Sequence, residues 1–143
     1  MTVAAILSEK GRQVVTMGPK QTLREVCETL AAHKIGAVVL IDADGRIGGI
    51  LSERDIVRAL AGDGASALDR PAEAFMSAKV VTCSDTETTD QVLGRMTAGR
   101  FRHMPVVRDG RLIGLVSIGD VVARRIELAE REAADMRSYI ASA

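Results

Sequence analysis

The chain has very few aromatic residues and no net charge. Phe75, Phe101 and Tyr139 are its only aromatic residues, and tryptophan is absent. It therefore lacks the rows of rings on which proteins stack single-stranded nucleic acid. Its 19 basic and 19 acidic residues balance, which argues against general binding to nucleic acid or to anionic membranes. Any basic patch must be local.

Cysteine and long apolar runs are also scarce. Cys27 and Cys83 lie in different segments without metal-ligand spacing, so we expect reduced thiols, with a disulfide or redox pair as the alternative. No apolar run reaches the length of a transmembrane helix. The N-terminus lacks the basic start of a signal peptide, and Glu9 soon follows its short apolar run. We therefore expect a cytoplasmic protein. With 47% hydrophobic residues in 143, the chain predicts one compact domain or two closely packed halves.

The second half of the chain repeats the first. The segment VVTMGPKQTLREV, which begins at Val14, aligns with VVTCSDTETTDQV, which begins at Val80, and the alignment continues after a one-residue deletion near Asp44. Both copies contain Asp-Gly-Arg, and both then contain the pattern Ser-x-x-Asp, at 52–55 and 117–120. Two copies in so short a chain predict two similar halves.

Each copy predicts the element order β-α-β-β-α. Apolar residues recur at helical spacing in the middle of each copy, and the Asp-Gly pairs at 44–45 and 109–110 predict hairpins. The expected strands are 14–16, 37–41 and 47–51 in the first copy and 80–82, 104–107 and 112–116 in the second. Residues 38–41 are continuously apolar, so both faces of their sheet should be covered. The expected fold class is α/β (α+β), with two halves related by a pseudo-twofold axis.

The segments RHMPVV, IGGILSERD and IGLVSIGD resemble the recurring pieces of the CBS domain, and the duplicated set resembles a stand-alone tandem pair, the Bateman module. The resemblance covers about residues 14–125. It implies a first repeat at 14–62, a connecting segment at 63–79 and a second repeat at 80–125. Residues 1–13 would then pack on the module, and 126–143 would extend the last helix.

The Ser-x-x-Asp pattern allows two interpretations. As a capping box it stabilises the start of a helix. As a ligand site it combines the free N–H groups of a helix N-terminus, which suit phosphate, with a carboxylate that can accept the two hydroxyls of a ribose. CBS pairs commonly bind adenine nucleotides in the clefts between their two copies. The resemblance therefore favours nucleotide binding, and helix capping is compatible with it.

The charges before the strand at 104–107 occupy places that the first copy fills with small residues. Arg102 and His103 align with Gly36 and Ala37, so fold stability does not require charge there. We interpret the pair as phosphate ligands; the alternative is a solvated strand end paired with carboxylates such as Asp109. Nothing marks Arg100 beyond its charge, so we expect a surface role for it.

The resemblance implies two unequal clefts, one marked by Asp120 and the other by Asp55. We expect Asp120 to mark the main site, because there the small residues leave room for a base. Its implied residues are Lys10, Ile35, Gly36, Ala37, Arg102, His103, Leu115, Ser117, Gly119 and Asp120. Phe101 and Arg102 should intrude on the base side of the other cleft. Its implied residues are Ile50, Ser52, Arg54, Asp55, Phe101 and Met104.

The segment after Asp120 predicts one long helix. Apolar residues recur at alternating spacings of four and three between Val122 and Ile140, which is a heptad seam. The alternative is a helix that folds back on its own domain. Because CBS pairs usually form flat dimers, we expect a homodimer, which this helix could strengthen.

These features predict a regulatory module that binds AMP, ADP, ATP or NAD(H), senses energy or redox state and modulates a separate protein. The alternative is a ligand-free structural adaptor or dimerisation module with vestigial clefts. An enzyme is not expected, because no Ser-His-Asp set, metal cluster or P-loop is present and neither His33 nor His103 has an evident catalytic partner. We expect no catalytic cofactor, metal, nucleic-acid partner or membrane partner.

Overall fold

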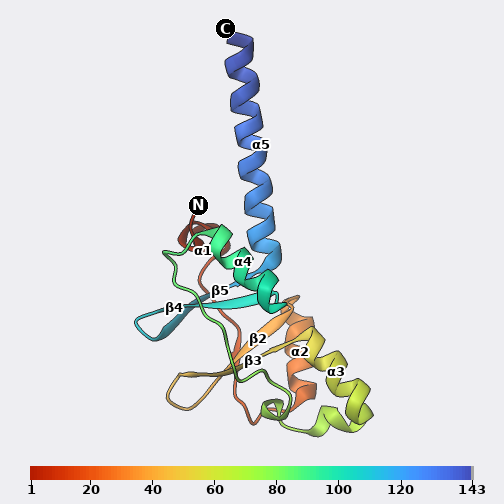
Figure 1. Cartoon of the computed structure of the whole chain (residues 1–143). Helices are drawn as coiled ribbons and strands as arrows, with labels where there is room; N and C mark the ends of the chain where they lie inside the picture. Colours follow the sequence, from red (N-terminus) through yellow and green to blue (C-terminus); the bar gives the residue numbers. More distant parts are fainter. Residues whose placement is uncertain (143) are drawn as a thin grey trace.

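The strands form two small sheets, one in each half of the chain. The computed structural model describes residues 1–142. In the first half, β1 (Thr16–Met17) runs parallel to β2 (Ala37–Ile41), and β3 (Ile47–Ser52) runs antiparallel to β2. In the second half, β4 (His103–Arg108) pairs antiparallel with β5 (Arg111–Ser117). The two hairpins lie next to one another in the body of the molecule (Figure 1).

Helices cover these hairpins and extend beyond them. The five α-helices are α1 (Val3–Lys10), α2 (Leu23–His33), α3 (Glu53–Asp63), α4 (Thr89–Gly99) and α5 (Ile118–Ser142). The connecting segment forms two 3₁₀ helices, η1 (Gly64–Asp69) and η2 (Ala72–Ala74). The expected mixed fold of two related halves with a long C-terminal helix is confirmed, and both expected hairpins form. Asp109 and Gly110 turn the second hairpin with φ values of 51° and 76°, as a tight hairpin turn requires.

The first strand predicted for the second half, at 80–82, does not form. Only Cys83, the next residue, makes a parallel bridge, to Val106. In the first half the Val39 N–H donates to the Val15 carbonyl. The residue that corresponds to Val39 in the second half is Pro105, which has no N–H to donate. The parallel ladder therefore cannot extend past Cys83.

Each half receives part of its core from the segment that precedes the other half. Helix α1 buries Val3, Ile6 and Leu7 in the core of the second half, while the connecting segment buries Ala67 and Ala72 in the core of the first. The two segments are alike in sequence: TVAAILSEK at 2–10 corresponds to PAEAFMSAK at 71–79. The bridges Thr2–Thr88 and Thr22–Pro71 are likewise equivalent.

Glycine lets these segments lie directly on the strands. A Cβ at Gly114 of β5 would lie 2.7 Å from Leu7 Cδ2, so a larger residue there would force the buried Leu7 side chain to shift. Gly49 of β3 has the same relation to Met76. Close contact between a helix and a strand thus depends on the missing side chain.

Helix α5 leaves the body and projects from it (Figure 1). All residues from Ala129 to Ser142 are exposed. The alternative that this part folds back on its own domain is therefore wrong.

The Leu7→Ala substitution tests whether α1 is part of the core. Leu7 is buried beneath strand β5, so its truncation should lower the free energy of unfolding by about 2–5 kcal/mol. Urea denaturation monitored by circular dichroism measures the change. Ser8→Ala, at an exposed neighbouring position, should have little effect. Equal small effects of both substitutions would show that α1 does not complete the core.

Candidate functional site

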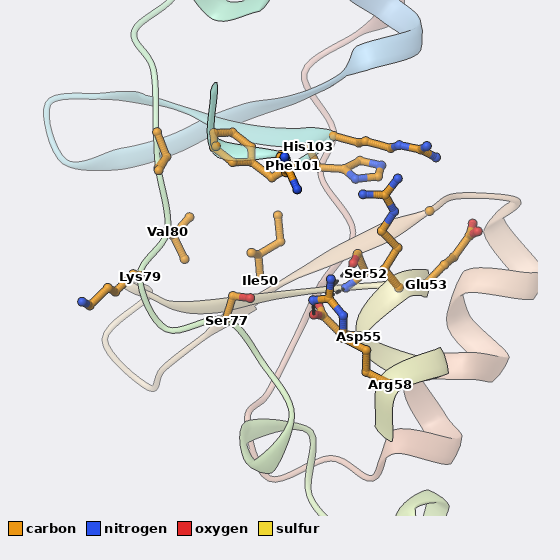
Figure 2. A pocket seen from close by; sticks show the side chains of 16 residues that line it. Ile50, Ser52, Glu53, Asp55, Arg58, Ser77, Lys79, Val80, Phe101 and His103 are labelled. Carbon is orange, nitrogen blue, oxygen red and sulfur yellow. Dashed lines mark hydrogen bonds and ion pairs between the residues drawn. The ribbon is translucent and has the colours of Figure 1, made fainter. Parts of the chain in front are cut away.

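A cavity of about 570 Å³ opens between the two halves, beside the N-terminus of α3. Strand β3 and α3 form one wall, and residues 99–103, which lead into β4, form the opposite wall (Figure 2). Residues 77–81 close a third side. Its lining residues are Gly36, Ile50, Ser52, Glu53, Arg54, Asp55, Arg58, Ser77, Lys79, Val80, Val81, Gly99, Arg100, Phe101, Arg102 and His103.

The Ser-x-x-Asp pattern caps α3 at the edge of this cavity. The backbone N–H of Ser52 donates to Asp55 Oδ2 over 2.8 Å, and the Ser52 hydroxyl donates to the same oxygen over 3.1 Å. Asp55 Oδ1 lies 4.0 Å from the Arg58 guanidinium. The capping interpretation therefore holds for one carboxylate oxygen, and the other faces Arg58.

Positive charge is concentrated around the cavity. Its lining contains the basic residues Arg54, Arg58, Lys79, Arg100 and Arg102. The acidic residues of the lining are Glu53 and Asp55. Because the whole chain has no net charge, this local excess of cations creates a positive potential at one place. Such a cavity suits an anionic ligand.

His103 crosses the seam between the halves and fills space beside Gly36. A Cβ at Gly36 would lie 3.2 Å from the His103 ring and 3.2 Å from Glu53 Oε1. Burial, reinforced by the charge of Lys10, lowers the pKa of His103 below its ordinary value of 6.5. The ring is therefore neutral at neutral pH and can both donate and accept a hydrogen bond.

The equivalent carboxylate in the second half is already bonded. Lys10 Nζ donates to Asp120 Oδ2 over 2.7 Å and to the Leu115 carbonyl over 2.8 Å. The Ser117 N–H donates to Asp120 Oδ2 and the Asp120 N–H donates to Ser117 Oγ, over 2.8 and 3.2 Å, which completes a capping box at α5. Burial raises the pKa of Asp120, but the hydrogen bonds from Lys10 and Ser117 outweigh burial and hold this pKa below its ordinary value.

The structure groups the sequence-predicted residues differently from the two predicted sets. The 570 Å³ cavity brings together Ile50, Ser52, Arg54, Asp55 and Phe101, expected around Asp55, with Gly36 and His103, expected around Asp120. It also includes Arg102, which was expected at both clefts. Lys10 and Asp120 line a separate cavity of about 270 Å³ against α1 and α5.

The remaining predicted residues line neither cavity. Met104 and Ala37 are buried within their strands, and Ile35 packs against the core of the first half. Leu115 offers its carbonyl to Lys10, and Ser117 caps α5. Gly119 is exposed in the first turn of α5.

Three basic residues of the cavity were missed by sequence reasoning. Arg58 follows Arg54 by four residues on α3, a spacing that places both on one side of the helix. Lys79 corresponds to Lys10 once the preceding segments are aligned. Arg100, expected to have a surface role, lines the cavity where its φ of 56° ends α4.

The cysteines do not form a disulfide. Cys27 and Cys83 are free thiols. Burial raises the pKa of both, that of Cys83 to about 11. Neither is activated as a thiolate.

Lys10→Met should change the pH dependence of stability. A carboxyl whose folded-state pKa lies below its ordinary 3.8 stabilises the fold above that pH, and the contribution is lost as the pH falls through the folded-state pKa. Removal of the Lys10 ammonium should cost about 1 kcal/mol at pH 7 and make the decline below pH 4 shallower. Urea titrations between pH 7 and pH 2 measure both. Lys20→Met, which breaks the exposed pair with Glu73, is the control, and identical curves for the two variants would contradict the prediction.

Comparison with known proteins places the chain in a family. The family model for the CBS domain matches residues 5–62 and 72–127. A crystal structure of a CBS-domain containing protein from Agrobacterium tumefaciens is 52% identical, with a TM-score of 0.86, over 87% of this chain and 99% of that one. A CBS domain protein from Pyrobaculum aerophilum, complexed with AMP, is 32% identical, with a TM-score of 0.78, over 91% of this chain and 99% of that one.

A third structure carries other adenosine compounds. The CBS domain pair of protein MJ0100, in complex with 5′-methylthioadenosine and S-adenosyl-L-methionine, is 26% identical, with a TM-score of 0.78, over 89% of this chain and 96% of that one. Within residues 1–142, no helix is long and apolar enough to cross a membrane, and no three His, Cys, Asp or Glu side chains gather to hold a metal ion. The two family matches cover most of the chain, and it belongs to the CBS-domain family as a tandem pair.

Proposed function

We propose that the cavity beside Asp55 binds an adenine nucleotide and that the protein is a regulatory module. The observation that carries this proposal is the combination, in one cavity, of a cationic wall with a carboxylate at a helix N-terminus. Asp55 Oδ1 would accept a ribose hydroxyl. Ile50, Val80 and Phe101 offer apolar surface for the base.

The charge of the cavity favours ligands that carry phosphate. Relatives have been crystallised with AMP, and with 5′-methylthioadenosine and S-adenosyl-L-methionine, and adenosine is common to all three. Five basic against two acidic side chains in the lining attract phosphate groups and repel a sulfonium cation. We propose that affinity rises from AMP through ADP to ATP, with NAD(H) as a further candidate because it also carries phosphates.

The cleft of Asp120 would be a second, weaker site. The sequence alone favoured it as the main one. A ribose at Asp120 must compete with the Lys10 ammonium 2.7 Å away, whereas Lys79, the counterpart of Lys10, lines an open cavity. We propose that this difference sets the order in which the clefts fill.

We further propose a non-catalytic, cytoplasmic homodimer that modulates a separate protein according to energy or redox state. The alternative is a ligand-free adaptor. The Lys10–Asp120 ion pair favours this alternative for the cleft of Asp120. There Lys10 already donates to the carboxylate that a ribose would otherwise use.

Calorimetry on Asp55→Ala and Asp120→Ala variants tests the assignment of the clefts. Loss of a charge-assisted hydrogen bond to the ribose should weaken the tightest ATP-binding event at least about tenfold in Asp55→Ala. Asp120→Ala should largely preserve it. The opposite result would support the sequence-based expectation that Asp120 marks the main site. No heat and no thermal shift with any adenine compound would support the adaptor.

Arg102→Met tests the role of the cationic wall. Removal of one charged group that contacts phosphate should weaken ATP about tenfold and AMP less, so that the ratio of their affinities falls. Arg111→Met, on the exposed start of β5 away from the cavity, is the matched control. Titrations at several salt concentrations should show a reduced salt dependence for Arg102→Met only. An unchanged ratio of ATP to AMP affinity would contradict phosphate binding by Arg102.

A further inference from the structure

The projecting part of α5 carries an apolar seam that no described part of the chain covers. Its side chains at alternating spacings of four and three are Val122, Ile126, Ala129, Ala133, Met136 and Ile140. The four larger ones are 41–66% exposed. From Ala129 onward every residue of the helix is exposed. An isolated helical segment of this length is only marginally stable in water, and two such seams can bury each other.

We infer that this seam pairs with the same seam of a second copy, as a parallel, in-register two-stranded coiled coil. In heptad terms Ile126, Ala133 and Ile140 occupy the a positions, and the residues between them on the seam occupy d. β-branched residues at a favour two strands. The alanine layers let the two helices approach closely.

The charges beside the seam select the parallel arrangement. In a parallel pair, each g position lies beside the e position of the following heptad on the other helix. Arg125 then faces the partner's Glu130, and Glu132 faces the partner's Arg137. Both contacts join opposite charges, and the twofold axis repeats each of them. Arg125 also forms an ion pair with Asp90 of its own chain. The contact between Glu132 and the partner's Arg137 is therefore the better one to test.

An antiparallel arrangement of the same layers joins like charges. There, e faces e and g faces g. If all six seam residues of each helix stay in contact with the other helix, Glu130 lies beside the partner's Glu130. Glu132 then lies beside the partner's Glu132. Like charges at such positions are unfavourable. The charges beside the seam thus stabilise the parallel orientation and destabilise the antiparallel one.

The outer face of the helix agrees with this assignment. Arg124, Arg131 and Ser138 occupy the f positions, opposite the seam. Arg124 bonds Glu9 of α1, so the f side is the one that faces the body at the base of the helix. The seam faces away from α1 and is free to meet a second copy.

This inference deepens the proposed homodimer and is independent of nucleotide binding. Disulfide trapping tests it in the full chain with Cys27→Ser, since buried Cys83 stays unreactive. Met136→Cys places two thiols across a parallel seam, and mild oxidation should give at least about tenfold more covalent dimer than Ser138→Cys on the opposite face. Both positions are exposed, so neither substitution disturbs the core.

Two results of this experiment would overturn the inference. Equal trapping by Met136→Cys and Ser138→Cys would show that the seam does not pair with itself. Stronger trapping in a mixture of Ile126→Cys and Met136→Cys than in Met136→Cys alone would show the antiparallel arrangement. If sedimentation still shows a dimer while Met136→Cys fails to crosslink, the bodies associate without the helices, and the homodimer proposal survives alone.

Charge exchange supplies a second readout. Glu132→Arg and Arg137→Glu each replace two attractive contacts by two repulsive ones, so each variant alone should self-associate about tenfold more weakly in sedimentation equilibrium. An equimolar mixture restores opposite charges at both contacts and should recover the affinity of the unmodified chain. Ser138→Arg and Ser138→Glu are the matched controls. Unchanged self-association in the charge variants would overturn the pairing.

Discussion

The structure depends on an exchange of segments between the two halves. Leu7 of the N-terminal helix packs on Gly114 of the second half, and Met76 of the connecting segment packs on Gly49 of the first. The core of each half is therefore complete only when the segment that precedes the other half packs into it. Since buried aliphatic side chains supply most of the stability of so small a domain, the halves form one cooperative unit. Their fixed contact also gives the clefts between them a defined shape.

The same exchange places a lysine at each cleft. Lys10 is the last residue of α1, and Lys79 is the last residue of the equivalent connecting segment. Lys10 reaches Asp120 and the Leu115 carbonyl. In the first half the backbone of Ser77 bonds to Ile50, the counterpart of Leu115, and Lys79 lines the cavity. One carboxylate is thereby neutralised within the chain, and the other faces a positively charged cavity. The pseudo-twofold symmetry of the fold does not extend to the electrostatics of its clefts.

The repeat made most of the fold predictable. Local sequence rules predict the hairpins with Asp-Gly turns, the continuously apolar β2 and the capping boxes. The family resemblance predicts how these elements are arranged in two repeats. The missing strand at 80–82 was visible in principle, because Pro105 stands where Val39 must donate a hydrogen bond. The exchange of segments is not visible in the repeat that begins at Val14 and Val80, because the exchanged segments precede both copies. The equivalence of Lys79 and Lys10 therefore does not follow from that repeat.

The grouping of the site residues was harder to predict, because it depends on which side chains cross the seam. Sequence alignment shows that Arg102 and His103 replace small residues, but it does not show toward which cleft they turn. The cavity beside Asp55 includes both, together with Arg100. Only the three-dimensional arrangement of residues 99–103 against α3 reveals this.

Close packing at the seam brings His103 of the second half against Gly36 of the first. The ring of His103 lies so close to Gly36 that even a Cβ there would meet it at 3.2 Å. A residue larger than glycine at 36 would therefore require the His103 ring to shift. Small residues at 36 and 37 thus lie where bulky ones stand at 102 and 103, and the two nearly symmetric halves leave cavities with different linings.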